Sequence, residues 1–243
     1  LLEWFAGFPD DAVIRAREGL SHARGLGRPL TLAYALCMSA AVHQCRGETE
    51  RTRDLAREVV VLSKEHDFPY WIAWGFVLEG WALAASGELH EGESKMQSGL
   101  AMYRDTGALL FEPWSLALLA DVHLHAGRIE EALESTSRAL ESSELLHGYF
   151  YGAEFHRLKG ELMLARNADV RAAENCFLHA LKIAREQGAR SLELRCAVSL
   201  GELRKLQGRE DECRELVRGV LDLFDQGLDT ADLRRATRLL GRD

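Results

Sequence analysis

The residues best placed to do chemistry are two carboxylates and a guanidinium at helical spacing. Glu154, Arg157 and Glu161 stand at i, i+3 and i+7, so they share one face if this segment is helical. A ladder of this kind can form an active site in a groove, and it can equally form a solvated salt-bridge face. The chain contains no G-x-x-x-x-G-K-[ST] phosphate loop and no paired aspartates on predicted strands. We therefore predict no catalytic residue and no cofactor, and we keep an enzyme that uses these three side chains as an alternative.

Two histidines suggest a metal site at first sight. His123 and His125 are two residues apart, so they point to different sides of a helix, whereas helical zinc pairs are four apart. Asp121 and His125 do have the i, i+4 spacing, but no nucleophile accompanies them, and a hydrogen bond on the helix surface is the simpler interpretation. The five cysteines are odd in number and include no Cys-x-x-Cys pair, which favours small buried thiols over disulfides or zinc. We predict no metal site and a reducing, cytoplasmic location.

The composition is that of a helical globular protein. Of 243 residues, 47% are apolar and 28% are charged, which allows a large core without disulfides. The four prolines are sparse, and each stands where a helix can begin. No apolar run approaches the ~20 residues of a membrane span, and no signal sequence opens the chain. The net charge of -8, with basic residues scattered among acidic ones, argues against direct binding of nucleic acid.

A two-residue marker recurs with a spacing of 40 residues, or 41 for the last one, and ends in glycine in all cases but one. The markers are Ala6-Gly7, Arg46-Gly47, Ser86-Gly87, Ala126-Gly127, Arg166-Asn167 and Gln207-Gly208. Seven residues before each marker from the second on stands a small residue: Ala40, Gly80, Ala120, Gly160 and Gly201. About twenty residues after each marker stands a turn former: Gly27, Asp67, Gly107, Gly148, Gly188 and Gly227. Glycine inside a helix costs roughly 1 kcal/mol relative to alanine, so the three helical glycines predict close approach of two helices.

Each repeat therefore has room for two helices and two turns, and no stretch alternates like a strand. We predict an all-α fold, an α-α superhelix of about six helix pairs with a capping helix that begins after Asp229 as its N-cap. The prediction comprises thirteen helices in one domain over 1–243, with repeats near 1–27, 28–67, 68–107, 108–148, 149–188 and 189–227 and a cap over 228–243. Because the chain begins inside a predicted helix without an initiator methionine, we expect a fragment of a longer protein.

These repeats have the features of tetratricopeptide repeats, although each unit is longer than usual. A small residue lies in the first helix, a glycine precedes the second helix, and small and aliphatic residues follow along the second helix. More specifically, the sequence resembles the C-terminal repeat region of bacterial multidomain proteins in which a class III adenylate/guanylate cyclase domain or a signalling ATPase precedes the repeats. The stretches that carry this resemblance are Trp71–Gly75, Gly80–Leu83, Gly152–Leu164, Ala173–Ala184 and Phe224–Leu240. Related regions occur in LuxR-type transcriptional activators, which usually end in a DNA-reading helix-turn-helix, whereas this chain stops just past its predicted cap.

In tetratricopeptide arrays the first helices line the concave face, and the resemblance implies that recurring first-helix positions bind a ligand or partner there. The candidates are Tyr34, Trp74, Trp81, Trp114, Asp121, Glu154, Arg157, Glu161 and Arg195. This stripe is aromatic toward the N-terminus and charged toward the C-terminus, which suits a partner with an apolar part and a polar part. Aromatic residues at helical spacing are also the usual filling of a helical core, so the alternative buries these rings between stacked helices.

The leading hypothesis is a non-enzymatic binding and scaffolding domain, the regulatory or sensory C-terminal region of a bacterial signalling protein. The expected partner is a protein or peptide segment, a small effector, or another domain of the same polypeptide, with no direct nucleic acid and no membrane. Besides the enzyme, a second alternative is an architectural dimerisation arm, in which the stripe meets a copy of itself.

Overall fold

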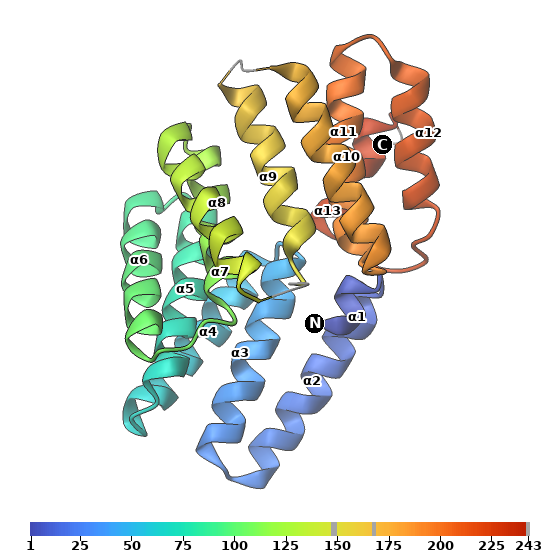
Figure 1. The fold of residues 1–243 in the computed structure, drawn as a ribbon. Helices are drawn as coiled ribbons and strands as arrows, with labels where there is room; N and C mark the ends of the chain where they lie inside the picture. Colours follow the sequence, from blue (N-terminus) through green and yellow to red (C-terminus); the bar gives the residue numbers. More distant parts are fainter. Residues whose placement is uncertain (147–149, 167–168, 242–243) are drawn as a thin grey trace. The chain divides into compact units, whose positions relative to one another are not determined.

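The computed structural model describes residues 1–146, 150–166 and 169–241. Within this part of the chain it contains thirteen helices and no strand, so the all-α prediction is confirmed (Figure 1). The predicted turn at Gly148 and the predicted marker residue Asn167 lie outside the described residues. The helices are α1 (Leu2–Phe5), α2 (Pro9–Leu26), α3 (Pro29–Cys45), α4 (Thr49–Glu65), α5 (Pro69–Ala85), α6 (Leu89–Asp105), α7 (Glu112–His125), α8 (Ile129–Glu144), α9 (Gly152–Ala165), α10 (Val170–Glu186), α11 (Arg190–Leu206), α12 (Glu210–Leu221) and α13 (Ala231–Leu239).

The ends of the helices follow from local sequence chemistry. Proline occupies the first turn of α3, α5 and α7, where its missing N–H would have no partner in any case. After α3 the chain turns at Gly47, whose φ of 77° favours glycine, and the Glu48 N–H donates back to the His43 carbonyl at 2.9 Å. Asp67 takes the same role after α4 with a φ of 53°. All the predicted turn formers in the described residues have a positive φ: Gly27, Asp67, Gly107, Gly188 and Gly227.

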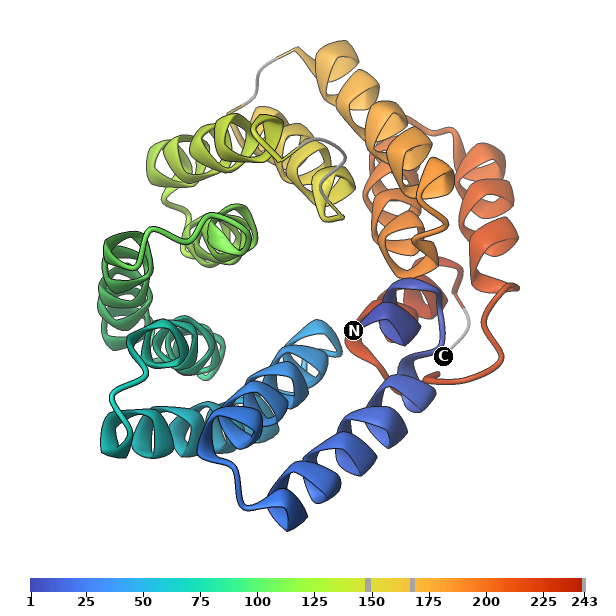
Figure 2. The same cartoon turned by 60° about the horizontal axis from the view of Figure 1, so that its bottom comes forward.

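The described residues form two compact units, and the first consists of Leu1 with Asp11–Arg128. In this unit each helix from α3 to α7 packs against the next, and α3, α5 and α7 also contact one another in order. Figure 2 shows α3, α5 and α7 along one side of the unit, with α4 and α6 on the other side. The first helices of successive pairs therefore form one layer, which we call the first-helix face.

The second unit consists of Leu2–Asp10 and the described residues from Ile129 onward. Here α9 packs on α10 and α11 on α12, and the two first helices α9 and α11 contact each other. The helix α13 packs against α11 and α12, and α1 packs against α11. Leu233 and Ala236 of α13 are buried, so the prediction of a capping helix is confirmed.

The boundary before the cap differs from the prediction. The last paired helix, α12, ends at Leu221 instead of running on, and α13 begins after Thr230 instead of Asp229. The reason is a tertiary contact: Asp10 donates its N–H to Gln226 Oε1 at 2.9 Å and accepts the Gly227 N–H on Oδ2 at 2.8 Å. These hydrogen bonds hold the segment around Gln226 and Gly227 in a turn, and the local sequence does not predict this turn.

Small residues bring helices into close contact at the predicted positions. A Cβ on Gly80 of α5 would lie 2.5 Å from the Gly92 carbonyl oxygen of α6, so these two backbones touch. A Cβ on Gly160 would lie 2.5 Å from the Phe177 ring, and one on Gly201 would lie 2.7 Å from Val217 Cγ2. The predicted close approach of paired helices is therefore confirmed, because any larger residue would clash.

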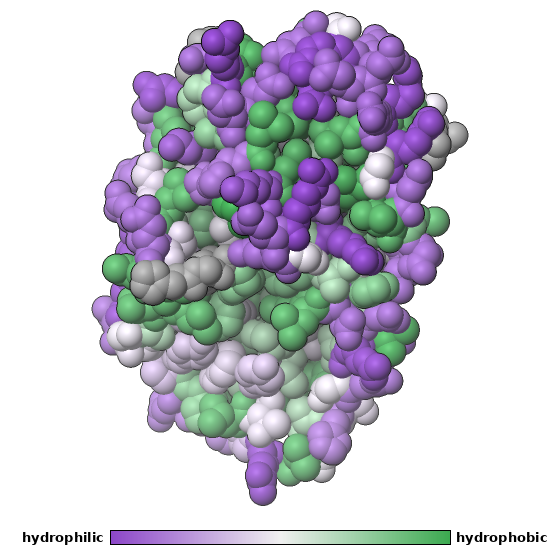
Figure 3. All heavy atoms as spheres, turned by 45° about the vertical axis from the view of Figure 1, so that its right-hand side comes forward, coloured by the Kyte–Doolittle hydropathy of each residue, from purple (hydrophilic) through white to green (hydrophobic). Residues whose placement is uncertain are grey.

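The surface of the chain is mixed. On the face drawn in Figure 3, hydrophobic side chains form separate patches between hydrophilic ones. Among the described helices, none combines the length and the apolar character that crossing a bilayer requires.

Candidate functional site

The aromatic part of the predicted stripe lies in the first unit, and the structure separates its members. Tyr34 on α3 is 54% exposed, whereas Trp74, Trp81 and Trp114 are only 2%, 8% and 3% exposed. The expectation that these tryptophans project into a groove is therefore wrong. Their positions face neighbouring helices, because first helices pack directly on one another, and the packing alternative describes them correctly.

Tyr34, Trp74 and Trp114 belong to one connected cluster of rings. The Tyr34 ring meets Trp71 edge-on at 5.7 Å between centroids, and Trp71 meets Trp74 at 6.4 Å. Trp74 in turn stacks on Trp114 at 5.5 Å and meets Phe111 edge-on at 4.0 Å. We call these five residues the aromatic platform. It links α3, α5 and α7 and supports the exposed Tyr34 on a rigid base.

Asp121 takes part in a surface contact, as predicted. The His125 Nδ1 lies 2.8 Å from the Asp121 carbonyl oxygen and 3.6 Å from its carboxylate, and His125 is exposed. His123 points elsewhere: it is buried, and its Nε2 lies 3.1 Å from Glu93 Oε1. The two histidines thus face different environments, which follows from their i, i+2 spacing.

The charged part of the stripe lies in the second unit and forms a buried ion cluster. Arg157 donates from Nε and Nη2 to the two carboxylate oxygens of Glu154, at 2.9 and 2.6 Å. Its Nη1 lies 2.5 Å from Glu161 Oε1 and 3.3 Å from Ser199 Oγ on α11, and the Ser199 hydroxyl donates to Glu161 at 2.7 Å. Glu154 and Arg157 are 4% and 5% exposed. The ladder is therefore an interior network that joins α9 to α11, and the interpretation as a solvated face is wrong.

Arg195 extends this cluster to two further helices. Its Nε donates to Asp232 Oδ2 of α13 at 2.8 Å, and its Nη1 donates to the Tyr151 hydroxyl at 3.2 Å. The guanidinium also lies 3.7 Å from Glu154 Oε1 and 4.9 Å from the centre of the Trp4 ring of α1. Charged and aromatic groups from α1, α9, α11 and α13 thus meet around one arginine.

The cluster keeps its carboxylates ionised. Burial raises the pKa of Glu154, but the positive charges of Arg157 and Arg195 lower it by more, so the pKa lies below its ordinary value. Burial also raises the pKa of Glu161, but Arg157 and the Ser199 hydroxyl lower it by more. A carboxyl held in this way is ionised near neutral pH and is no general acid there.

Several members of the two clusters were absent from the predicted stripe: Trp4, Trp71, Phe111, Tyr151, Ser199 and Asp232. Ser199 follows Arg195 by one helical turn, so the same periodicity could have found it. Trp4, Tyr151 and Asp232 come from other segments of the chain, and no spacing in the sequence connects them to Arg195.

A histidine pair in the second unit makes stability depend on pH. The rings of His156 on α9 and His179 on α10 lie 4.4 Å apart, and burial, then the charges of His179 and Lys159, lower the pKa of His156 to about 4. The folded chain therefore keeps this imidazole neutral, and its stability contribution is present above the unfolded pKa of 6.5 and is lost as pH falls toward 4. Since the ring is partly solvated, we expect His156→Gln to remove about 1 kcal/mol of the acid sensitivity.

Urea denaturation at about pH 7 and about pH 4.5 measures this effect. The exposed His22 on α2 supplies the control, because His22→Gln removes a histidine without touching the pair. Equal pH dependence of His156→Gln and the parent chain would contradict the assignment.

Comparison with known proteins shows what this architecture is similar to. No family model matches the chain. An uncharacterized protein of Rhizobium meliloti (strain 1021) is 29% identical over 178 residues, which are 73% of this chain but only 17% of that protein. The solved structure of the apo form of RapI covers 99% of this chain and 81% of its own, with a TM-score of 0.68 and 14% identity. BtubC (BKLC) from P. vanneervenii covers 88% of this chain and 90% of its own, with a TM-score of 0.62 and 18% identity.

These likenesses define the class of fold. The chain is an all-α protein of the tetratricopeptide-like repeat type, with helices packed in sequential pairs as in RapI and BtubC. The tetratricopeptide-like fold predicted from the 40-residue period is confirmed. The chain spans 17% of the length of the curated relative that it matches.

Proposed function

We propose that this chain is a non-catalytic binding domain that holds a protein or peptide segment against the first-helix face of its first unit. The observation that carries this proposal is Tyr34, a 54% exposed aromatic side chain on a layer in which Trp74, Trp81 and Trp114 are buried. Leu30 precedes it by one helical turn and is 55% exposed, so α3 presents two neighbouring apolar side chains to solvent. A partner that covers these two side chains would explain why they are exposed one helical turn apart.

The aromatic platform makes Tyr34 a suitable anchor. Aromatic residues contribute much of the binding energy at interfaces when their neighbours hold them in place. Tyr34 packs edge-on against Trp71, and Trp71 rests on the buried pair of Trp74 and Trp114. Little side-chain entropy is then lost when a partner side chain covers the tyrosine ring.

We further propose that the domain serves a larger bacterial signalling protein as its regulatory region. The match to 17% of a much longer relative supports the idea of a region within a long polypeptide. The resemblance to repeats that follow class III cyclase or signalling-ATPase domains suggests which kind of module accompanies it. The full reading frame of the parent gene tests this part: a cyclase or ATPase module before Leu1 supports it, and a different catalytic class contradicts it.

The binding proposal can be tested with a phage-displayed random peptide library selected on the purified chain. We expect enrichment of peptides with an aromatic or aliphatic anchor, whose affinity for Tyr34→Ala falls by at least about tenfold. Val61→Ala is the matched control, because Val61 is 58% exposed on the second helix α4 and lies outside the first-helix face. Selected peptides that bind Tyr34→Ala as well as the parent chain would contradict the proposal. Both variants should keep the parental thermal stability, since both side chains are largely in solvent.

A further inference from the structure

A cavity of about 220 Å³ lies in the first unit between α2, α3 and α4. Its base is apolar: Leu20 and Leu55 line it and are only 6% and 2% exposed. Two of its three walls come from the second helices α2 and α4, and neither Leu30 nor Tyr34 of α3 lines it, so it is separate from the site proposed around Tyr34. The volume lies below the range of roughly 300–1,000 Å³ typical of pockets for drug-sized ligands, which points to a small occupant.

The polar part of the lining is cationic. Arg17 and Arg24 come from α2 and Arg51 comes from α4, and no carboxylate lines the cavity. Arg24 is already engaged, because its Nη2 lies 2.8 and 2.9 Å from the two carboxylate oxygens of Glu58. In the described part of the chain, Arg17 and Arg51 form no ion pair. Two uncompensated guanidinium groups at one opening are notable in a chain whose net charge is -8.

The third wall of the cavity comes from α3. His43 of α3 lines the cavity, and its Nδ1 is hydrogen-bonded to the Glu48 carboxylate. Burial lowers the pKa of His43, Glu48 acts in the opposite direction, and the charges of Arg51 and Arg46 add to the lowering. The net pKa of His43 is below its ordinary value mainly because the ring is buried, and Arg51, which lines the cavity, acts in the same direction.

We infer that this cavity binds a small organic anion, with its carboxylate or phosphate group at Arg17 and Arg51 and a short apolar body against Leu20 and Leu55. Guanidinium groups bind both kinds of anion through paired N–H donors. The exposed arginines stand at the opening and the buried leucines at the base, so the polar head stays near solvent while the body enters. An inorganic ion would make no contact with Leu20 and Leu55, and an uncharged apolar ligand would form no ion pair with Arg17 or Arg51.

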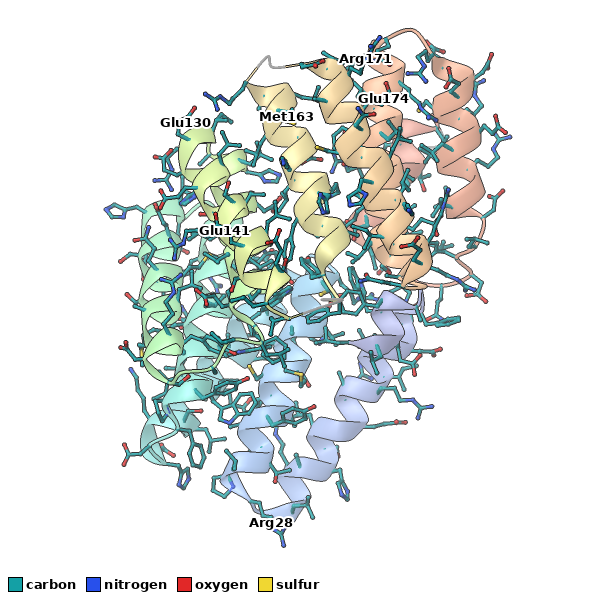
Figure 4. All side chains as sticks on the ribbon, in the orientation of Figure 1. Arg28, Glu130, Glu141, Met163, Arg171 and Glu174 are labelled. Carbon is teal, nitrogen blue, oxygen red and sulfur yellow. The ribbon has the colours of Figure 1, made fainter. Side chains whose placement is uncertain are left out.

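Isothermal titration calorimetry with four probes tests this inference: hexanoate, hexyl phosphate, hexanol and acetate. We expect hexanoate or hexyl phosphate to bind, and hexanol and acetate to bind at least about tenfold more weakly, because each lacks one half of the recognised structure. Arg17→Gln and Arg51→Gln should each weaken binding by about tenfold to a hundredfold. Arg28→Gln is the control, since Arg28 is an exposed arginine at the turn between α2 and α3, outside the cavity (Figure 4).

A second variant tests the cavity itself without changing charge. Ala16 of α2 lines the cavity, and Ala16→Leu should fill it and abolish binding of the anion that the parent chain binds. Preference for hexyl phosphate over hexanoate would assign a phosphate head, and the reverse a carboxylate. Failure of both anions to bind the parent chain would overturn the inference, and so would equal affinity for the parent, Ala16→Leu and Arg17→Gln. Because Tyr34 plays no part here, these results and those of the peptide selection are independent.

Discussion

Replacing Arg157 by methionine should lower the free energy of unfolding by about 3–5 kcal/mol, the largest effect that we expect from a single side chain in the second unit. The guanidinium is 5% exposed and binds Glu154 through both carboxylate oxygens and Glu161 through one. Methionine has a similar length but no charge, so it leaves a 4% exposed Glu154 with a weaker partner in Arg195 at 3.7 Å. Urea denaturation followed by far-ultraviolet circular dichroism measures the loss.

The pH dependence of the same variant identifies the cause. The parent chain gains stability from these carboxylates above their unfolded pKa of 4.5 and loses it as pH falls through the lower folded values. Without Arg157, burial should dominate and raise the pKa of Glu154, so the destabilisation should shrink as pH falls toward about 5.

Two further variants serve as controls for this result. Arg214→Met removes an exposed arginine whose partner Asp211 lies 2.7 Å away with a 99% exposed side chain, so it should change stability by less than about 0.5 kcal/mol. Adding Glu154→Gln to Arg157→Met should restore part of the loss, because no buried full charge then remains at that position. A loss for Arg157→Met no larger than that for Arg214→Met would show that the cluster contributes only packing.

Replacing Gly80 by alanine should cost about 3 kcal/mol in the first unit, although alanine is the better helix former. The new Cβ would lie 2.5 Å from the Gly92 carbonyl oxygen and 2.8 Å from the Met96 N of α6. Both atoms belong to the backbone of the facing helix, so no side-chain rotation can relieve the contact and α5 and α6 must move apart. Thermal denaturation should show a decrease of about 6–12 °C in Tm for a chain of this length.

The control for Gly80→Ala has the opposite expected sign. Gly19 lies inside α2 and has no atom within 4 Å of the position that a Cβ would occupy. Gly19→Ala should therefore stabilise the chain by about 0.5–1 kcal/mol, because it only reduces the freedom of the unfolded state. Two substitutions of the same type then differ by about 4 kcal/mol, and similar effects at both positions would refute the close contact of α5 and α6.

The helices, the turns between them and the positions where helix pairs touch could be predicted from the sequence. The helices and turns depend on interactions within a few residues, and the small residues at one repeat position mark where paired helices touch. Proline pre-sets the first turn of a helix, a residue with positive φ ends it, and apolar spacing selects one face to bury. Because the same helix pair recurs with a 40-residue spacing, each repeat supported the assignment of the next. The spacing even predicted the turn at Asp67, which stands where the other repeats have glycine.

Which of the predicted site residues face solvent depends on how neighbouring helices pack. Tyr34, Trp74 and Trp114 occupy the same position of successive repeats, yet only Tyr34 is exposed. A repeat position fixes the direction of a side chain on its own helix, but burial depends on what the neighbouring helices place there. The two tryptophans stack on each other between α5 and α7, while Tyr34 rests edge-on against Trp71.

The ion cluster shows the same division. Helical spacing predicted that Glu154, Arg157 and Glu161 share one face of α9, but it did not predict whether that face is buried or exposed to solvent. The face is buried because α11 packs on α9, and α13 and α1 pack on α11 in turn. Trp4 and Asp232 reach Arg195 from opposite ends of the chain. Contacts over such separations form only when the whole unit folds, since local periodicity carries no information about which distant segments will meet.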